Sequence, residues 1–493
     1  MRLRLIQAIL GTTLVVSLVL LPTQSARAAP VAFSPSEIEK YVTDYIDRSG
    51  YPGVSIAITQ GEEVLLAAGY GHDSTGADMT ADTPMPVASV SKSFTALAVM
   101  QLVESGNMAL DEPVQSYLPD FEVDDPGSSK ITVRELLNQT SGISDETLRE
   151  KSLPQPDSLE AAEQRARDAT LAEAPGTRRH YTNTNYHLAA RLVEVVSQQP
   201  FTDYLRKKVL DPLAMNDSTS IDTTPDDLPE GVREGHTYLY GISVAATEAE
   251  RFVSGSDGVI TTADDMAKWL IMQNNEGIAT DGERLATPES IDLMRSTPND
   301  QPYGLGWDRD QKGRWGHSGV WFTYTAYQML LPSGHGIAIM SNSGLGLGNE
   351  SPYLLADGIA TILEGKEPQQ IAATRLYIDL ALAALTLISI GIGAYTVRRA
   401  GTWAAGAARR PWWMTALRLA AWFVPLLLLI ALPRLLGSWI GGGRDLTHEQ
   451  LLLYSPALMI WFGAATTIGV VVVAVRLRSL QVIGRFRGLV SSP

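Results

Sequence analysis

The sequence predicts an α+β domain, an antiparallel sheet flanked by helices with an all-helical subdomain, followed by three transmembrane helices. Two observations support this fold class. Residues 31–370 alternate helical and strand periodicities, with pairs of neighbouring strands near both ends of the region. The residues after 370 contain three apolar stretches, each long enough to cross a hydrocarbon layer of about 30 Å.

The first segment has the pattern of a signal peptide. Arg2 and Arg4 are followed by an apolar stretch over 5–21 and by a small-residue cleavage pattern that ends at Ala28. An uncleaved anchor helix is the alternative interpretation. The short apolar stretch favours cleavage, so we expect residues 1–28 to be removed.

The expected elements of the domain at 29–370 follow from hydrophobic spacing and turn residues. Ile38, Val42 and Tyr45 share one face of a helix expected at 35–48. The remaining expected elements are strands at 53–59 and 63–69, a helix from about 89 to 105, strands at 322–331 and 336–342, and a closing helix at 351–363.

The apolar stretches predict how the chain is oriented in a membrane. We expect transmembrane helices at 377–397, 414–432 and 451–475, and a tail at 476–493. The excess of arginine in cytoplasmic loops places the first connection and the tail in the cytoplasm. The domain at 29–370 is then extracytoplasmic, where a signal peptide would direct it. The arginines behind this prediction are Arg398, Arg399, Arg409, Arg410, Arg476, Arg478, Arg485 and Arg487.

Charge and composition exclude several classes of function. The formal charge is −15 in total, +3 over residues 1–30 and +9 over residues 371–493, so residues 31–370 carry −27. Such an acidic surface repels phosphate backbones, and we expect no nucleic-acid partner. The chain has no cysteine, which excludes disulfides, thiolate catalysis and cysteine-ligated metals. The histidines lack ligand spacing, so we expect no metal and no cofactor.

Three short motifs indicate nucleophilic catalysis. Ser89 and Lys92 form an S-x-x-K pattern at the start of a predicted helix, where residues three apart share a face. The amine can therefore take or relay the proton of the hydroxyl. Tyr181-Thr182-Asn183 gives Y-x-N, and Gly316-His317-Ser318-Gly319 directly precedes a predicted strand.

With these motifs in this order, residues 35–365 resemble the class C β-lactamase and penicillin-binding-protein-like serine hydrolases. That family has S-x-x-K, then Y-x-N, then K-T-G or a variant such as H-x-G. The resemblance extends beyond the three motifs. It also includes the segments 101–106, 110–114, 117–119, 136–142, 211–213, 258–269 and 303–307.

The resemblance implies a role for each motif residue. Ser89 is the acylated nucleophile, and Lys92 and Tyr181 form the proton-transfer pair. The backbone N–H groups of Ser89 and Val320 form the oxyanion hole. The residues expected to bind substrate are Asn183, His317, Ser318 and Gly319.

The third motif departs from the lysine found in many members of that family. His317 stands at that position, and we expect it to be partly charged near pH 7. It should therefore bind a substrate carboxylate less firmly than a lysine does. With so weak a second cation, we expect Lys92 and Tyr181 to share one proton as a coupled pair.

The resemblance implies a membrane-anchored serine hydrolase that forms an acyl-enzyme. The expected partner is a small-molecule or peptide substrate: an ester, a D-amino-acid peptide or amide, or a β-lactam-like compound. The alternative is a penicillin-recognising sensor that is acylated at Ser89 and does not turn over. The short tail offers no cytoplasmic signalling domain, which favours the hydrolase. The sequence leaves the oligomeric state open.

Overall fold

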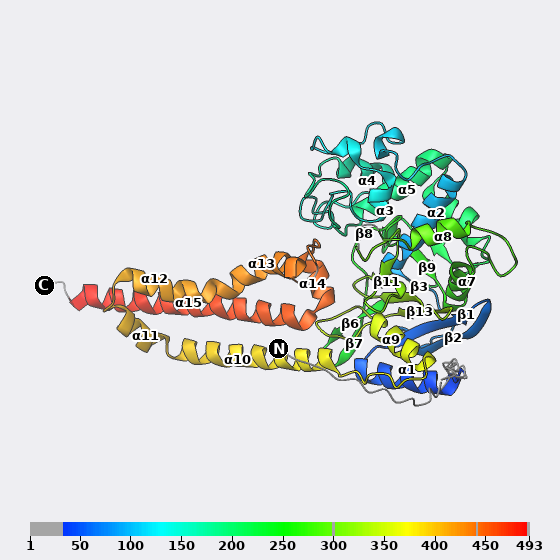
Figure 1. Cartoon of the computed structure of the whole chain (residues 1–493). Helices are drawn as coiled ribbons and strands as arrows, with labels where there is room; N and C mark the ends of the chain where they lie inside the picture. Colours follow the sequence, from blue (N-terminus) through cyan, green and yellow to red (C-terminus); the bar gives the residue numbers. More distant parts are fainter. Residues whose placement is uncertain (1–32, 298–300, 440–441, 491–493) are drawn as a thin grey trace, which may run out of the picture.

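A computed structural model describes residues 33–297, 301–439 and 442–490, with side chains up to residue 483. It has two parts: a mixed α+β domain, and a group of long helices that projects from it (Figure 1). The predicted signal peptide lies outside the described residues.

The domain is built on one six-stranded sheet in which every neighbouring pair is antiparallel. The first strands of the domain pair with its last, because Val54 on β1 lies opposite Ser341 on β13. The order is β10 (Asp308–Arg309), β11 (Trp315–Val320), β12 (Thr325–Leu330), β13 (His335–Ser341), β1 (Gly53–Gln60) and β2 (Glu63–Gly71).

Helices cover both faces of this sheet. Side chains alternate along a strand, so Ile56 and Ile58 of β1 pack on one face with α1 (Pro35–Ser49) and α9 (Pro352–Leu363). Ala57 points the other way, into the core that contains α2 (Ser91–Glu104) and α7 (Ala263–Asn274). The predicted α+β architecture is confirmed.

A helical subdomain and several short strands complete the domain. The subdomain lies beyond α2 in Figure 1 and includes α3 (Val133–Leu137), α4 (Leu159–Ala166) and α5 (Thr184–Ser197). Two further helices, α6 (Phe201–Leu205) and α8 (Pro288–Met294), also contact α2. The short strands are β3 (Met85–Pro86), β4 (Thr219–Ser220), β5 (Thr223–Thr224), β6 (Gly235–Leu239), β7 (Ile242–Ala246), β8 (Arg251–Phe252) and β9 (Val259–Thr261).

Three helical segments are long and apolar enough to cross a membrane: Thr374–Arg398, Trp412–Trp439 and Pro456–Ile483. They belong to α10 (Thr374–Arg398), α12 (Trp412–Ala420) with α13 (Val424–Trp439), and α15 (Pro456–Val490). Two short helices, α11 (Ala400–Ala407) and α14 (His448–Tyr454), lie in the connections. The third predicted span starts at Leu451, which lies in α14; a new helix begins at Pro456 because proline cannot continue the preceding turn.

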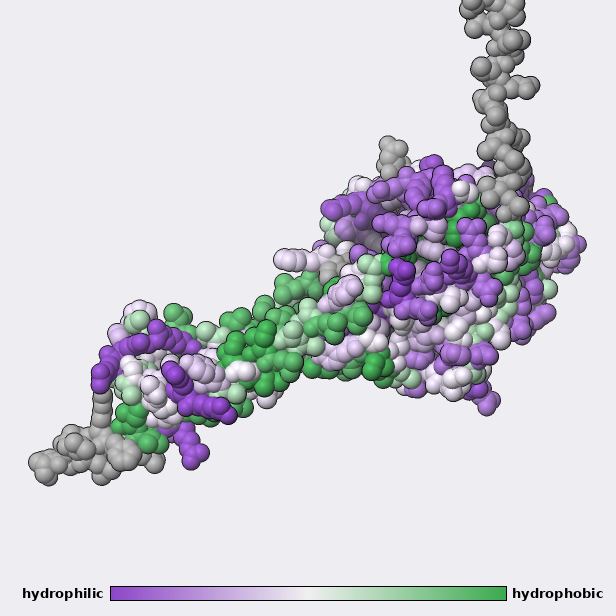
Figure 2. All heavy atoms as spheres, turned by 90° about the horizontal axis from the view of Figure 1, so that it is seen from below, coloured by the Kyte–Doolittle hydropathy of each residue, from purple (hydrophilic) through white to green (hydrophobic). Residues whose placement is uncertain are grey.

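The surface of the projecting helices is apolar along most of its length (Figure 2). Hydrophilic residues cover the domain and gather again at the far end of the helices. The connection between α10 and α12 lies at that far end, whereas α14 lies next to the domain (Figure 1). An apolar band between two polar ends is the pattern of a membrane-spanning bundle.

The first turns of α10 are held against the domain. The Arg375 guanidinium lies 3.9 Å from the ring centroid of Tyr238 and 4.7 Å from that of Tyr51. Asp379 accepts a hydrogen bond of 2.7 Å from the backbone N–H of Tyr240. Because both polar side chains are buried and partnered, the junction between domain and helices is a packed contact.

Candidate active site

The three motifs meet at one cavity with a volume of about 690 Å³. Ser89 comes from the turn before α2, and Tyr181 and Asn183 from the segment before α5. The cavity wall also includes three residues of β11: His317, Ser318 and Val320. Its size is typical of a small-molecule site.

Ser89 lies in a strained turn at the start of a buried helix. Residues 88–90 form a 3₁₀ turn that leads directly into α2, and Ala88 has a φ of 46°. Positive φ is unfavourable for a residue with a Cβ and is found where the surroundings enforce it. Phe94, one turn further along α2, stacks on Trp269 at 3.8 Å and fixes the helix in the core. The turn therefore presents Ser89 to the cavity from a rigid base.

Lys92 is fully buried, with 0% of its surface exposed, and donates three hydrogen bonds. Its Nζ lies 2.9 Å from Ser89 Oγ, 3.0 Å from Asn183 Oδ1 and 3.0 Å from the carbonyl oxygen of Ser256. An ammonium has three protons to donate and no lone pair to accept with. The three acceptors thus match a protonated lysine in the resting site.

Asp257 is the residue of the site that sequence reasoning missed. Its Oδ1 accepts a hydrogen bond of 2.5 Å from Ser89 Oγ and lies 3.5 Å from Lys92 Nζ. Its Oδ2 accepts from Asn183 Nδ2 at 2.8 Å. The motif segments do not contain this acid, because it comes from the loop before β9. The available signal for Asp257 was its position directly before the segment 258–269, which contributes to the family resemblance.

The electrostatics of the site keep Asp257 ionised. Burial alone would raise the pKa of its carboxyl, but Lys92, Arg251 and the hydrogen bond from Ser89 together lower that pKa well below its ordinary value. A carboxylate with so low a pKa is a weak base. Asp257 therefore orients the hydroxyl of Ser89 and balances the charge of Lys92.

Tyr181 lies beside Lys92, with its ring centroid 5.1 Å from Nζ. Among the described residues, no hydrogen bond joins its hydroxyl to Ser89 or Lys92. Apo sites often tighten such contacts only when substrate binds. Both ends of the Asn183 amide are occupied, since its oxygen accepts from Lys92 and its nitrogen donates to Asp257, so Asn183 holds these two side chains in position.

The expectation of a partly charged His317 is wrong. Burial, and secondly the charge of Lys92, lower the pKa of His317 to about 3. Its Nδ1 donates to the Ser318 carbonyl at 2.7 Å, which leaves Nε2 to accept from the hydroxyl of Tyr303 at 2.9 Å. His317 is therefore neutral near pH 7 and attracts no substrate carboxylate by charge.

Gly319 explains how the third motif comes next to the nucleophile. A Cβ built at this position would lie 2.0 Å from the carbonyl oxygen of Val87. Only glycine lets β11 pass so close to the turn that carries Ser89. The strand then ends at Val320, which is 38% exposed and lines the same cavity as Ser89.

The far wall of the cavity comes from the C-terminal helical region. Its lining residues there are Leu436, Gly442, Arg444, Leu446, Leu451 and Tyr454. They lie on α13, on α14 and in the segment that connects them. Among the described residues, no group of three or more His, Asp or Glu is arranged to hold a metal ion.

Curated relatives share about two thirds of the chain. Protein flp of Staphylococcus aureus (strain MW2) is 27% identical over 327 residues, which cover 63% of this chain and 63% of that protein. Penicillin-binding protein 4 of Amycolatopsis lactamdurans is 29% identical over 318 residues, covering 60% of this chain and 81% of that protein. The chain thus spans under two thirds of the length of protein flp.

Solved structures share the fold. The octameric penicillin-binding protein homologue from Pyrococcus abyssi has a TM-score of 0.58 and 26% identity, covering 71% of this chain and 82% of that one. The D-amino acid amidase from Ochrobactrum anthropi SV3 has a TM-score of 0.56 and 25% identity, covering 67% of this chain and 97% of that one.

A family profile described as Beta-lactamase matches residues 38–358. The match contains the S-x-x-K serine, the Y-x-N tyrosine and the strand that carries His317. These are the residues that meet in the cavity. The chain therefore belongs to the beta-lactamase family of penicillin-binding-protein-like serine hydrolases.

Proposed function

We propose that the protein is a membrane-anchored serine hydrolase that becomes acylated on Ser89. The observation that carries the proposal is the hydrogen-bond network around this hydroxyl. The hydroxyl accepts a hydrogen bond from Lys92 at 2.9 Å and lies at the wall of the cavity. A nucleophile within hydrogen-bond reach of a proton-transfer group is the signature of covalent catalysis.

The proposed reaction has two steps. In the first, Ser89 Oγ bonds to the acyl carbon, and its proton passes through the Lys92–Tyr181 pair to the departing alcohol or amine. In the second, a water molecule attacks the ester carbon, its proton follows the reverse route, and Oγ regains a hydrogen. The N–H groups of Ser89 and Val320 would stabilise the oxyanion, at about 3–4 kcal/mol for each such donor.

The substrate is an ester, a D-amino-acid peptide or amide, or a β-lactam-like compound. The neutral state of His317 disfavours substrates that need a charged residue at this position of the third motif. The similarity to a D-amino acid amidase supports the amide class. The similarity to a penicillin-binding protein supports acylation by a β-lactam.

The orientation of the chain in the membrane can be inferred from the position of the connections between its helices. The segment between α13 and α14 contacts the catalytic domain, so this connection lies on the domain's side of the bilayer. The opposite side carries the arginines at the ends of α10 and α12. We infer from the positive-inside rule that this opposite side is cytoplasmic and the catalytic domain extracytoplasmic.

The experiment is active-site labelling of the full chain in detergent. A fluorescent fluorophosphonate should label the wild type and leave Ser89→Ala unlabelled. A fluorescent penicillin, a chromogenic ester and a D-alanine anilide then separate the substrate classes. If the fluorescent penicillin is released from Ser89 with time, the protein is a hydrolase. If the penicillin persists on Ser89, the result supports the sensor. An unlabelled wild type would contradict the proposal.

A further inference from the structure

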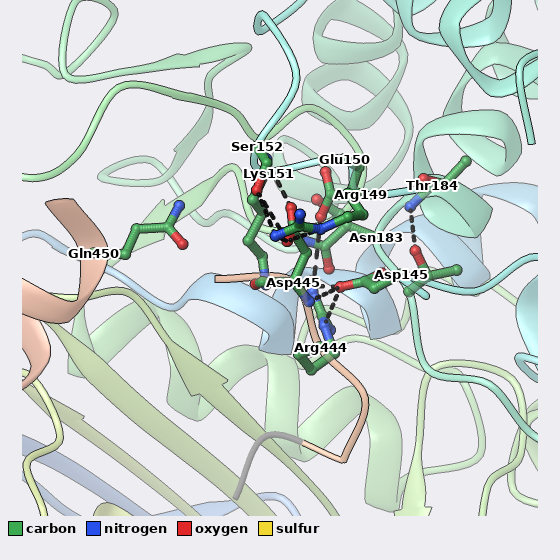
Figure 3. Close-up of polar contacts among 12 residues, drawn as sticks. Asp145, Arg149, Glu150, Lys151, Ser152, Asn183, Thr184, Arg444, Asp445 and Gln450 are labelled. Carbon is green, nitrogen blue, oxygen red and sulfur yellow. Dashed lines mark hydrogen bonds and ion pairs between the residues drawn. The ribbon is translucent and has the colours of Figure 1, made fainter. Parts of the chain in front are cut away.

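A segment of the C-terminal region enters the catalytic domain beside the active site. Arg444 and Asp445 lie between α13 and α14 and contact the loop at 145–152 (Figure 3). Arg444 Nε donates to Asp145 Oδ2 at 2.8 Å. Asp445 accepts from the N–H of Ser152 at 2.7 Å and from its hydroxyl at 2.9 Å.

Buried charges hold this contact together. The side chains of Asp145, Glu150 and Asp445 are 1–2% exposed. Arg149 pairs with Asp445 at 2.9 Å, and Lys151 lies 3.9 Å from Asp145. Buried charges persist only where partners compensate their lost hydration, so the geometry of such a cluster is well defined. The segment that carries Arg444 is accordingly fixed relative to the catalytic domain.

From this position Arg444 also faces the catalytic cavity. Its Cζ lies 4.9 Å from the ring centroid of Tyr181, and the residue lines the same cavity as Ser89. Three further cations line that cavity, against the two carboxylates of Asp257 and Asp308; they are Lys151, Arg179 and Arg251. These three cations have acidic partners: Arg179 lies 3.7 Å from Asp308, Arg251 3.5 Å from Glu248 and Lys151 3.9 Å from Asp145. Arg444 uses its Nε for Asp145, and among the described residues its two terminal nitrogens make no hydrogen bond, so they are donors that a ligand can use.

The same segment gives the cavity an apolar side. Leu436, Leu446, Leu451 and Tyr454 line it from the C-terminal region, and Phe322 and Leu345 line it from the catalytic domain. Leu436 lies on α13, which is part of the candidate membrane span Trp412–Trp439. The apolar side of the cavity is thus continuous with a helix that crosses the membrane.

We propose that this segment completes the active site, and that Arg444 and its apolar neighbours bind an amphiphilic substrate with an aliphatic chain beside an anionic group. This inference rests on the proposed function of Ser89. The guanidinium donates paired hydrogen bonds that match a carboxylate or a phosphate. An aliphatic chain gains free energy when it leaves water for the leucine-lined wall.

Protection of Ser89 tests this proposal without assuming which side of the scissile bond carries the charge. The rate of fluorophosphonate labelling is measured on the full chain in detergent with increasing decanoate, decanamide or butyrate. Decanoate should halve the rate at a concentration about tenfold lower than either decanamide or butyrate. Decyl phosphate as a fourth probe shows whether a phosphate or a carboxylate is preferred.

Variants separate a binding role from a structural one. Arg444→Gln should remove the preference for decanoate over decanamide, with the protection by each ligand expressed relative to the variant's own labelling rate without ligand. Arg444→Lys should retain part of the preference. Arg434→Gln is the matched control, because Arg434 is exposed on α13 and does not line the cavity. Arg434→Gln should show the same preference as the wild type. Because each ligand partitions into detergent to the same extent with every variant, this partition does not affect the comparison between variants.

Three outcomes would overturn the inference. One is equal protection by decanoate and decanamide in the wild type, which needs no variant and is independent of folding. Another is an unchanged preference in Arg444→Gln. The last is protection by butyrate as strong as that by decanoate. If the wild type is not labelled at all, the proposed function itself fails, and this result is distinct from the other three.

Discussion

At the scale of single residues, Asp257 determines the resting state of the site. It accepts a hydrogen bond from Ser89 and offsets the charge of Lys92, so the nucleophile is held in one rotamer by a carboxylate that is a weak base. The proton that leaves Ser89 during attack must therefore go elsewhere. Tyr181, with Lys92 and Arg444 about 5 Å from its ring, is the group placed to take part.

We predict that Asp257→Asn lowers both stability and reactivity. Removing one partner of a buried ion pair leaves Lys92 uncompensated, at a cost of about 3–5 kcal/mol in the free energy of unfolding. The labelling rate of Ser89 should fall at least tenfold, because the neutral amide of asparagine is a weaker acceptor for the hydroxyl than a carboxylate. Thermal unfolding and fluorophosphonate labelling measure the two effects. Asp308→Asn is the control, because it makes the same change at a carboxylate of the same cavity that pairs with Arg179 at 3.7 Å.

His317 gives a prediction about pH. Its pKa in the folded protein is about 3, below the ordinary value of 6.5, so the unfolded chain binds a proton that the folded chain does not. The stability that depends on neutral His317 is complete above pH 6.5 and is lost as the pH falls toward 3. At pH 5 the loss is about 2 kcal/mol.

His317→Gln should therefore lose less stability than the wild type between pH 7 and pH 5. Apparent unfolding temperatures in detergent at the two pH values provide the measurement. His187 is also buried with a pKa of about 3 and remains in the variant, so part of the acid sensitivity persists. Identical pH dependence of the two proteins would show that His317 is protonated without cost.

At the scale of elements, the packing of β11 on the turn at 88–90 forms the site. This contact depends on the absence of a side chain at Gly319, where a Cβ would meet the carbonyl oxygen of Val87 at 2.0 Å. Gly306 serves α2 in a similar way, since it has a φ of 75° and a Cβ there would meet the carbonyl oxygen of Lys92 at 2.7 Å.

We predict that Gly319→Ala slows labelling of Ser89 at least tenfold. The added methyl group forces β11 away from the nucleophile and separates the two proposed oxyanion donors. Val320→Ala is the matched control, since it trims an exposed side chain of the same strand and keeps the backbone. Labelling rates and circular dichroism of both variants provide the measurement. Wild-type labelling in Gly319→Ala would show that the strand can shift without consequence.

The elements near the three motifs were predictable because their signals are local. The i, i+3 spacing of Ser89 and Lys92 and the hairpin of β12 and β13 follow from helix and strand periodicity. Asp257 was missed because it is brought to Ser89 across 168 positions by the pairing of β3 with β9. Arg444 was not predicted as part of the site, because side-chain contacts between distant segments leave no periodic signal. The charge of His317 was misjudged because it depends on burial.

At the scale of the whole molecule, the β-lactamase-like domain and the C-terminal region line one cavity together. The far wall of the cavity belongs to the C-terminal region, and α10 packs against the domain through Arg375 and Asp379. A simple tether would leave the domain free to turn. Here two separate contacts, at α10 and at Arg444, hold the domain relative to the bundle.

Topology can be tested with single cysteines, because the chain has none of its own. A membrane-impermeant maleimide should label Ser36→Cys, on the exposed surface of α1, in intact spheroplasts. It should label Gly401→Cys, in the connection at the far end, only after the membrane is opened. Labelling of Gly401→Cys alone would reverse the proposed orientation, and labelling of both sites before opening would contradict a membrane between them.

The packed junction at Arg375 implies a particular rate law. An enzyme whose reactive centre stays at a constant height above the lipid surface meets the amphiphilic reactant proposed above, which partitions into the bilayer, by lateral diffusion in two dimensions. Its turnover should then follow the mole fraction of reactant in the bilayer. Diluting that reactant with inert phospholipid at constant bulk concentration should slow the reaction in proportion.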